Sequence, residues 1–200
     1  MSKINALCVY CGSNPGSDPA FVKAAQRFGK ILAENRVRLI YGGGSIGLMG
    51  AVSEAVQEHG GEATGVIPEF LTTQERPRRT GQELIVTRDM HERKQTMFER
   101  ADGFVALPGG VGTLEEIVEQ MTWAQLGRHK KPMLFANING YWNPLIELVA
   151  HMREYKFMPT ERGIKLLVAE RVEDILPMMQ DAASRIAEAE KAMAVPVERL

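Results

Sequence analysis

The sequence is short of the features that mark nucleic-acid-binding, secreted and membrane proteins. Its 24 Lys and Arg almost balance its 25 Asp and Glu, and no basic run is longer than Arg78-Arg79 or Lys130-Lys131. The clustered positive charge of a nucleic-acid-binding surface is therefore missing. The N-terminal segment lacks the apolar core of a signal peptide, and no stretch approaches the length of a membrane span. We expect a cytoplasmic protein with a small-molecule partner, and neither a nucleic-acid nor a membrane partner.

Cysteine is also scarce, because the chain has only Cys8 and Cys11, in a Cys-x-x-Cys. One such pair cannot complete a four-sulfur zinc site, and no His, Cys and Asp cluster has ligand spacing, so we expect no metal. In a cytosolic α/β protein the motif can also indicate a thioredoxin-like site. We favour a Cys8 that simply packs in a buried strand, because the segment from Cys11 to Ser17 does not run straight into a helix.

Apolar runs alternate with amphipathic stretches along the chain, without a low-complexity break or a repeat of solenoid length. The amphipathic stretches predict six helices. They follow an Asp18-Pro19 start, follow the glycine turn Gly42–Gly50 to about His59, span Arg93–Ala101, follow the central glycine turn to about Leu126, and span Trp142–Tyr155 and Asp174–Ala192. The apolar runs predict strands at Ile4–Tyr10, Val37–Tyr41, Ala63–Ile67, Glu83–Val86, Gly103–Leu107, Pro132–Ala136 and Leu166–Ala169.

Alternating strands and helices are typical of an α/β fold. We expect a single-domain, Rossmann-like parallel sheet with helices on both faces and ligands at the carboxyl ends of the strands. At 200 residues the chain is long enough for one well-packed domain, residues 1–200, with a C-terminal tail from about 194 to 200. Residues 68–81 show no clean period, and a loop of that length inside a domain is usually functional or mobile.

The stretch Leu107–Glu116, Leu-Pro-Gly-Gly-Val-Gly-Thr-Leu-Glu-Glu, joins a predicted buried strand to a helix. Its three glycines let the backbone bend and bring its N–H groups close to a bound group. The start of the following helix offers N–H donors and a partial positive charge, which favour an anion such as phosphate. No Gly-Lys-Ser/Thr follows, so this is not the common P-loop. Glu115 and Glu116 add a carboxylate pair next to the phosphate cradle, although acids there can also merely offset the helix dipole.

A second glycine turn, Gly42-x-Gly44-x-x-Gly47, matches the dinucleotide fingerprint. The fingerprint belongs after the first strand, with an acid at the end of the next strand to hold a ribose. Here it follows the second strand, and Glu62 precedes the third. We therefore disfavour a nicotinamide cofactor and expect no cofactor. A backbone contact to an anion or ribose, through Gly43 and Gly44, is the better interpretation.

A third segment, Met90-His-Glu-Arg-Lys94, leads into a predicted helix. The positive charges of Arg93 and Lys94 are unfavourable near the partial positive charge of a helix start, unless the two side chains bind an anion or pair with an acidic residue. Basic residues there also often point into solvent. His91 could donate a proton to a leaving group, but a single His at a helix start is more often a structural donor.

Together these motifs make the chain similar to the Lonely Guy family of cytokinin-activating nucleotide phosphoribohydrolases, whose members are often labelled "possible lysine decarboxylase". The resemblance covers nearly all of residues 4–185. It rests on Pro-Gly-Gly-x-Gly-Thr-x-x-Glu at Pro108–Glu116 and Met-His-x-Arg-Lys at Met90–Lys94, with Cys11-Gly-Ser13 and Tyr41–Gly50 as further family-like segments.

The resemblance implies hydrolysis of the N-glycosidic bond of a nucleoside 5′-monophosphate, either N6-modified AMP, AMP or both, to free base and ribose 5-phosphate. Its essential arginine and glutamate fall on Arg93 and Glu116. Arg93 could bind phosphate or position Glu116, and the sequence leaves both open. Contacts to the nucleotide would involve Ser13, Gly43, Gly44, Glu75, Lys94, Pro108, Gly109, Gly110, Val111, Gly112, Thr113 and Thr122.

Two other functions are alternatives to this reaction. A non-catalytic nucleotide carrier or sensor would use the same loop, although the Arg93 and Glu116 pair argues against it. A lysine decarboxylase would need pyridoxal phosphate on a lysine, and no lysine stands in a context that suggests a Schiff base. The resemblance also implies a homodimer whose site is completed by the partner. Met97, Phe98, Met121 and Trp123 lie at helical spacing near the site and either support this or fill the core of one chain.

Overall fold

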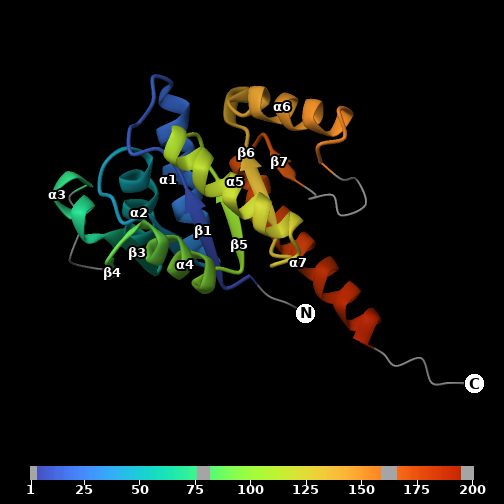
Figure 1. The fold of residues 1–200 in the computed structure, drawn as a ribbon. Coiled ribbons are helices and arrows are strands. Elements are labelled where there is room, and N and C mark those ends of the chain that lie inside the picture. Colours follow the sequence, from blue (N-terminus) through green and yellow to red (C-terminus); the bar gives the residue numbers. More distant parts are fainter. Residues whose placement is uncertain (1–3, 76–81, 159–165, 195–200) are drawn as a thin grey trace, which may run out of the picture.

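The computed structural model describes residues 4–75, 82–158 and 166–194, and its described strands form one seven-stranded sheet (Figure 1). All neighbouring strands pair in parallel, in the order β4-β3-β2-β1-β5-β6-β7. This confirms the predicted α/β fold with a parallel sheet. The strands are β1 (Ala6–Tyr10), β2 (Arg38–Tyr41), β3 (Ala63–Pro68), β4 (Glu83–Thr87), β5 (Gly103–Ala106), β6 (Met133–Ala136) and β7 (Leu167–Ala169).

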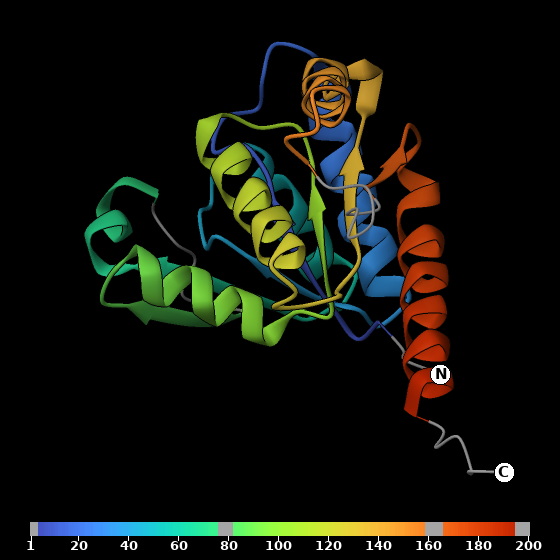
Figure 2. The ribbon, with the colours of Figure 1, turned by 45° about the vertical axis from the view of Figure 1, so that its right-hand side comes forward.

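Helices cover both faces of the sheet (Figure 2). The first apolar core joins the sheet to α1, α2 and α7, while the second joins its other face to α4, α5 and α6. The helices are α1 (Pro19–Glu34), α2 (Gly47–Glu58), α3 (Thr72–Glu75), α4 (Met90–Arg100), α5 (Val111–Gln125), α6 (Asn143–Glu154) and α7 (Val172–Ala194), with short 3-10 helices η1 (Glu69–Leu71) and η2 (Ile138–Gly140).

Helices α2, α4 and α7 begin earlier than the sequence predicts. Helix α2 starts at Gly47, inside the glycine turn. Helix α4 begins at Met90 instead of Arg93, because the Asp89 carboxylate accepts a hydrogen bond from the Glu92 N–H at 2.8 Å and caps the helix. Helix α7 begins at Val172, two residues before the expected Asp174, and continues through Pro177. By contrast, the Asp18 side chain caps α1 as expected, accepting from the Ala20 N–H at 2.8 Å.

The predicted irregular segment 68–81 is partly regular. Its first residue, Pro68, completes β3, and η1 and α3 follow directly. Its residues 76–81 lie outside the described ranges, as do residues 195–200 of the expected tail. The tail prediction is wrong at Ala194, which ends α7.

The strand order reverses beside β1, because β2 pairs with one edge of β1 and β5 with the other. In open parallel sheets, this reversal separates the loops that follow the two central strands and leaves a crevice at their carboxyl ends. Here those loops follow Tyr10 and Ala106. Both glycine-rich turns and the Cys11-Gly-Ser13 segment therefore lie at the same edge of the sheet.

Candidate active site

A pocket of about 220 Å³ lies at this edge, where the loops after β1, β2 and β5 meet α3, α4 and α5. It combines two carboxyl side chains, one guanidinium group and several glycines. Its lining consists of Val9, Tyr10, Cys11, Gly12, Ser13, Gly42, Met49, Glu75, Arg93, Gly110, Val111, Gly112, Thr113 and Glu116.

The loop before α5 is held against the loop after β1 by backbone contacts. The Gly12 N–H donates to the Pro108 carbonyl at 3.0 Å, and a Cβ on Gly109 would meet the Thr113 side chain and come within 2.8 Å of the Gly12 nitrogen. No side chain caps α5, whose first residue is Val111. The start of α5 therefore presents backbone N–H groups to the pocket, which suits a phosphate.

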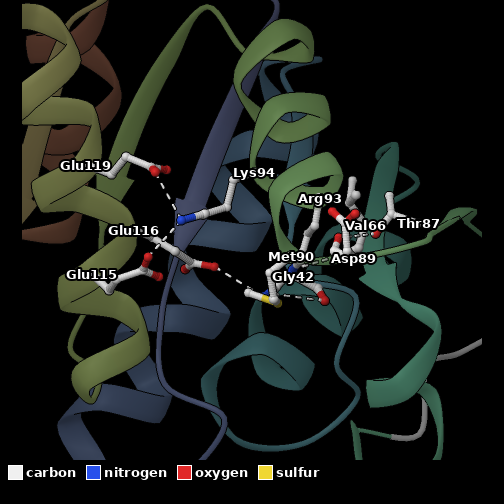
Figure 3. A network of polar contacts seen from close by, with 10 residues as sticks. All are labelled: Gly42, Val66, Thr87, Asp89, Met90, Arg93, Lys94, Glu115, Glu116 and Glu119. Carbon is white, nitrogen blue, oxygen red and sulfur yellow. Dashed lines mark hydrogen bonds and ion pairs between the residues drawn. The ribbon is translucent and has the colours of Figure 1, made fainter.

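Arg93 is buried and fixed by three neighbours (Figure 3). Its Nε donates to the Val66 carbonyl at 3.1 Å and its Nη2 to the Gly42 carbonyl at 3.4 Å. Its Nη1 lies 3.4 Å from Oε1 of Glu116, and the two side chains are only 7% and 11% exposed. Since the fork of Arg93 is engaged with β3, the glycine turn and Glu116, its position in the structure fits the role of holding Glu116 in place.

The carboxyl group of Glu116 lies in an environment that favours a proton. Burial raises the pKa of Glu116 to about 7, while Arg93 opposes the shift and the charges of Glu115 and Glu75 add to it. A carboxyl group with a pKa near 7 can both accept and release a proton at neutral pH, as a general base or acid requires.

Glu75 faces the same pocket from α3. Its Oε2 is buried and has no hydrogen-bond partner among the described residues, and burial raises the pKa of its carboxyl. A Cβ on Gly44 would come within 2.9 Å of this oxygen. The Glu75 carbonyl accepts a hydrogen bond from the Ser45 N–H at 3.0 Å, which ties α3 to the second glycine turn. An unpartnered carboxylate oxygen in a pocket is suited to a ligand hydroxyl or amine.

The structure brings together most of the sequence-predicted site. The pocket lining contains eight of those residues from four segments, namely Ser13, Glu75, Arg93, Gly110, Val111, Gly112, Thr113 and Glu116. Pro108 and Gly109 line an adjoining cavity of about 230 Å³, which shares Gly12, Ser13 and Gly110 with the pocket. Gly44 does not line the pocket but lies beside the carboxyl of Glu75, which does. Gly43 has a positive φ of 82° and packs against β3.

Three further candidates also lie outside the lining of this pocket. Lys94 pairs with Glu115 at 2.8 Å and Glu119 at 3.0 Å. Thr122 is exposed on α5, and its hydroxyl donates to the Val118 carbonyl at 3.0 Å. His91 is exposed on α4. Any contact of these residues with a nucleotide remains a prediction.

Sequence reasoning missed the groups that hold Arg93. The carbonyls of Gly42 and Val66 belong to segments far from Arg93 in the chain, and a backbone acceptor leaves no signal in the residue types. Met49 and Tyr10 also line the pocket without having been expected there. The Gly42-x-Gly44 motif marks this turn in the sequence, but the motif predicts a contact with a ligand and gives no indication that the Gly42 carbonyl accepts a hydrogen bond from Arg93.

The structure decides against the thioredoxin-like interpretation of the two cysteines. Cys8 and Cys11 are free and buried, and burial raises the pKa of both thiols, which makes them poor nucleophiles. Cys8 packs in the second apolar core, as expected. Glu62, the acid nearest the dinucleotide-like turn, is paired with Arg38.

The predicted apolar residues of α4 and α5 pack against one another within the chain. Met97 and Met121 are buried, and the rings of Phe98 and Trp123 meet edge to face at 5.0 Å. Packing within one chain therefore accounts for all four residues, so they do not support a dimer.

Comparisons with known proteins identify the family. A family model described as "Possible lysine decarboxylase" matches residues 49–179. A cytokinin riboside 5′-monophosphate phosphoribohydrolase of Arabidopsis thaliana is 43% identical over 192 residues, which cover 92% of this chain and 90% of that protein. The chain belongs to the Lonely Guy family. A second Arabidopsis thaliana family member of the same name is 48% identical over 148 residues, or 74% of this chain and 68% of that protein. A probable phosphoribohydrolase of this kind from Oryza sativa subsp. japonica is 43% identical, covering 90% of this chain and 79% of that protein.

Solved structures share the fold of this family member at lower identity. The molybdenum cofactor carrier protein of Chlamydomonas reinhardtii is 19% identical with a TM-score of 0.69, and the match covers 90% of this chain and 98% of that one. The molybdenum cofactor binding protein of Rippkaea orientalis is also 19% identical, with a TM-score of 0.65 and the same coverage. At this identity the likeness shows the fold alone. Across the described residues, no helix has the length and apolarity needed to cross a membrane.

Proposed function

We propose that this chain hydrolyses the N-glycosidic bond of nucleoside 5′-monophosphates, releasing the free base and ribose 5-phosphate. The substrates are N6-modified AMP, such as a cytokinin riboside monophosphate, and AMP itself. The observation that carries the proposal is the buried carboxyl of Glu116, in one pocket with the glycine loop at the start of α5. The names of the relatives support the same reaction.

The phosphate binds at the start of α5, to the N–H groups of Gly110–Thr113, with Ser13 opposite. These neutral donors and the helix dipole orient the nucleotide without bringing a cation to the sugar. Binding energy from the phosphate then holds the sugar so that its anomeric carbon faces Glu116. Glu75 accepts a hydrogen bond from a ribose hydroxyl or from the base through its unpartnered Oε2.

Glu116 acts as a carboxylate on the bond that breaks. As the base leaves with the electron pair of the C–N bond, positive charge develops on the sugar, and the carboxylate stabilises it. Water then attacks the anomeric carbon while Glu116 accepts its proton, and the departed base takes up one proton, so that release of the proton from Glu116 leaves the net reaction as nucleotide plus water to free base and ribose 5-phosphate. Arg93 positions Glu116 and stabilises the ionised form, through the 3.4 Å contact between the two side chains.

The description "Possible lysine decarboxylase" implies pyridoxal phosphate bound to a lysine, and the described residues do not fit that group. No lysine is among the residues that line the pocket. The neighbouring Lys94 is paired with Glu115 and Glu119. An amine held between two carboxylates stays protonated and is a poor nucleophile for a Schiff base. An absorbance spectrum of the purified protein with a pyridoxal band would contradict this assignment.

The proposed reaction uses only protein side chains and water, so we assign neither a metal nor a cofactor to it. Residues 1–200 act as one nucleotide-binding domain in this proposal. We also propose that the protein works in the cytoplasm on a small molecule, without nucleic acid. The near balance of acidic and basic residues, 25 to 24, supports the last point.

A homodimer with its sites near the interface is part of the proposal. Val111 and Val118 of α5 and Leu126, the residue that caps its C-terminus, are 83%, 38% and 75% exposed, and their spacing places them on one side of the helix. Thr122 shares this side and is exposed. A second copy packed on α5 would cover these apolar side chains and bring Thr122 toward the partner's pocket.

Product analysis tests the reaction directly. Purified protein is incubated with AMP, GMP, CMP and N6-prenylated AMP, and the products are separated by chromatography. We expect free adenine or N6-prenyladenine together with ribose 5-phosphate from the adenine nucleotides. Glu116→Gln should abolish release, whereas Glu147→Gln, the same change at an exposed position on α6, should not. Tight nucleotide binding by calorimetry without any release would instead indicate a carrier or sensor.

A further inference from the structure

The glycine loop before α5 contains three successive carbonyl groups, each of which accepts a hydrogen bond from a different part of the chain. The Pro108 carbonyl accepts from the Gly12 N–H at 3.0 Å. The Gly110 carbonyl accepts at 3.0 Å from an N–H group near the start of α5. The Gly109 carbonyl, which lies between them, accepts from the phenol hydroxyl of Tyr141 at 2.6 Å. Backbone groups thus hold the two outer carbonyls, and a side chain holds the middle one.

Tyr141 is fixed by packing against two aromatic neighbours. Its ring meets those of Phe21 and Trp142 edge to face, with the ring centroids 5.3 Å and 5.0 Å apart. The backbone turns tightly just before Tyr141, since Asn139 and Gly140 have positive φ values of 52° and 71°. Tyr141 lines the adjoining cavity of about 230 Å³ and is absent from the lining of the active pocket. These contacts give the hydroxyl a defined position behind the glycine loop.

The hydrogen bond from Tyr141 also sets the direction of a neighbouring N–H group. In a trans peptide, the C=O of one residue and the N–H of the next lie in one plane and point in opposite directions. A Gly109 carbonyl held toward Tyr141 therefore turns the Gly110 N–H to the other side. Of the two cavities, Tyr141 and Gly109 line only the adjoining one, whereas Gly110 lines both. The Gly110 N–H is thus directed to the side on which the active pocket lies.

A constraint matters at this peptide because both of its residues are glycines. Rotation of the peptide by half a turn changes the ψ of Gly109 and the φ of Gly110, and glycine tolerates both changes. The φ of Gly110 is −87° and would become positive. The rotated peptide would present the Gly109 carbonyl to the pocket in place of the Gly110 N–H. A carbonyl oxygen only accepts hydrogen bonds, so it cannot bind a phosphate oxygen.

We propose that Tyr141 is a positioning residue, whose hydroxyl fixes the Gly109–Gly110 peptide so that the Gly110 N–H is available to the substrate's phosphate. The inference rests on the proposed function in one respect, namely that this loop binds the phosphate of a nucleotide. It predicts that loss of the hydroxyl weakens binding of the phosphate and leaves binding of the nucleoside unchanged.

The test measures nucleotide binding by calorimetry with Tyr141→Phe in the full chain, because this change removes the hydroxyl and keeps the ring. Glu116→Gln serves as the background, so that turnover does not interfere. AMP should bind about fivefold more weakly, the effect of about one lost hydrogen bond, whereas adenosine, which lacks the phosphate, should bind equally well. Tyr155→Phe, the same change at an exposed tyrosine after α6, should alter neither affinity. A loss of affinity for both ligands, or for neither, would overturn the proposal.

A second variant tests the rotation of the peptide itself. Gly110→Ala disfavours the rotated peptide, because φ would become positive there, and a Cβ at this position meets nothing within 4 Å. Combined with Gly110→Ala, Tyr141→Phe should therefore weaken AMP binding by no more than about twofold relative to Gly110→Ala alone. An undiminished fivefold loss would mean that the hydroxyl does not act through this peptide.

Kinetics separate this inference from the proposed reaction. Without the Glu116→Gln change, Tyr141→Phe should raise the KM for AMP about fivefold with little change in kcat, since the phosphate is bound in both the ground state and the transition state. A lower kcat with an unchanged KM would contradict the positioning role. AMP that binds without release of base would refute the proposed reaction, while the binding test of Tyr141 would still apply.

A measurement on the native loop covers the case in which Tyr141→Phe does not fold by circular dichroism. Nuclear magnetic resonance of the protein with isotope-labelled glycine then follows the Gly110 amide. AMP should shift this resonance and adenosine should not, because only AMP brings a phosphate to the N–H group. A Gly110 amide that AMP leaves unmoved would overturn the proposal.

Discussion

Arg93 Nη1 and Glu116 Oε1 lie 3.4 Å apart, and each side chain is about nine-tenths buried. The contact joins the fourth residue of α4 to the sixth residue of α5, and two backbone carbonyls, from Gly42 and Val66, hold the arginine in place. Burial raises the pKa of Glu116 to about 7, and the positive charge of Arg93 opposes this shift by stabilising the ionised carboxylate.

Replacing Glu116 by Gln should lower kcat for AMP hydrolysis by about 10² to 10⁴, the range typical of lost general-base catalysis. Gln keeps the shape and can still accept a hydrogen bond from Arg93, so nucleotide binding should change little. Steady-state kinetics and calorimetry measure the two quantities. A Glu116→Gln protein with near-normal kcat would remove Glu116 from the mechanism.

Replacing Arg93 by Met should reduce both turnover and stability. The change leaves two buried carbonyls and the Glu116 carboxyl without their donor, and each unsatisfied buried group costs about 1–3 kcal/mol. Urea unfolding measures the loss. A double-mutant cycle with Glu116→Gln should show coupling in kcat, since the two side chains act as one unit. Simple additivity would mean that Arg93 works independently, for example on the phosphate.

The rate should depend on the ionisation of Glu116. Because the reacting form is the carboxylate, kcat/KM should rise as the pH increases through about 7, the pKa of Glu116. The profile of the wild-type protein between pH 5 and 9 checks this point. A rate that falls through the same range would indicate that Glu116 instead donates a proton.

The free energy of unfolding should also depend on the ionisation of Glu116, but it should fall as the pH rises, whereas the rate should increase. The folded-state pKa of Glu116 is raised from 4.5 to about 7, so its contribution is fully present below pH 4.5 and is lost as the pH rises to about 7. Glu116→Gln lacks this titration. It should therefore become more stable than wild type by up to roughly 3 kcal/mol as the pH goes from 5 to 8. Denaturant unfolding of both proteins at the two pH values measures the difference.

The two neighbouring glycines of the loop should differ in their tolerance of a side chain. A Cβ at Gly109 would clash with the Thr113 side chain and the Gly12 backbone, whereas a Cβ at Gly110 meets nothing within 4 Å. We expect Gly109→Ala to destabilise the protein by about 1–3 kcal/mol, as overpacking does, and Gly110→Ala to leave the unfolding midpoint nearly unchanged. Equal effects in thermal unfolding would mean that the loop is not held as described.

The proposed dimer can be broken at α5. Leu126→Asp places a charge on the exposed apolar side of the helix, so light scattering should show a monomer at concentrations where the wild type is a dimer. Leu148→Asp makes the same change on the exposed side of α6 and serves as the matched control. Should only the control dissociate, the interface would belong to α6.

Several elements could be predicted because their signals are local. The glycine turn before α5, the Asp18-Pro19 start of α1 and the apolar strands each follow from residue types within a few positions. The start of α4 was placed three residues late, because the cap at Asp89 was overlooked in a polar stretch. The nucleotide contacts of Lys94 and Thr122 are implied by the family resemblance, and neither residue lines the pocket. The local pattern at Lys94 allowed an anion or an acid as its partner, and the structure shows two acids, Glu115 and Glu119.

The sequence by itself determined the α/β alternation, the anion-binding loop and the presence of an arginine and a glutamate near it. Tertiary structure alone decided which neighbour each of these side chains meets: Arg93 faces Glu116, while Lys94, the next residue, faces Glu115 and Glu119. The physical reason is that helical periodicity sorts residues onto the sides of one helix, whereas the strand order around β1 determines which other elements those sides meet.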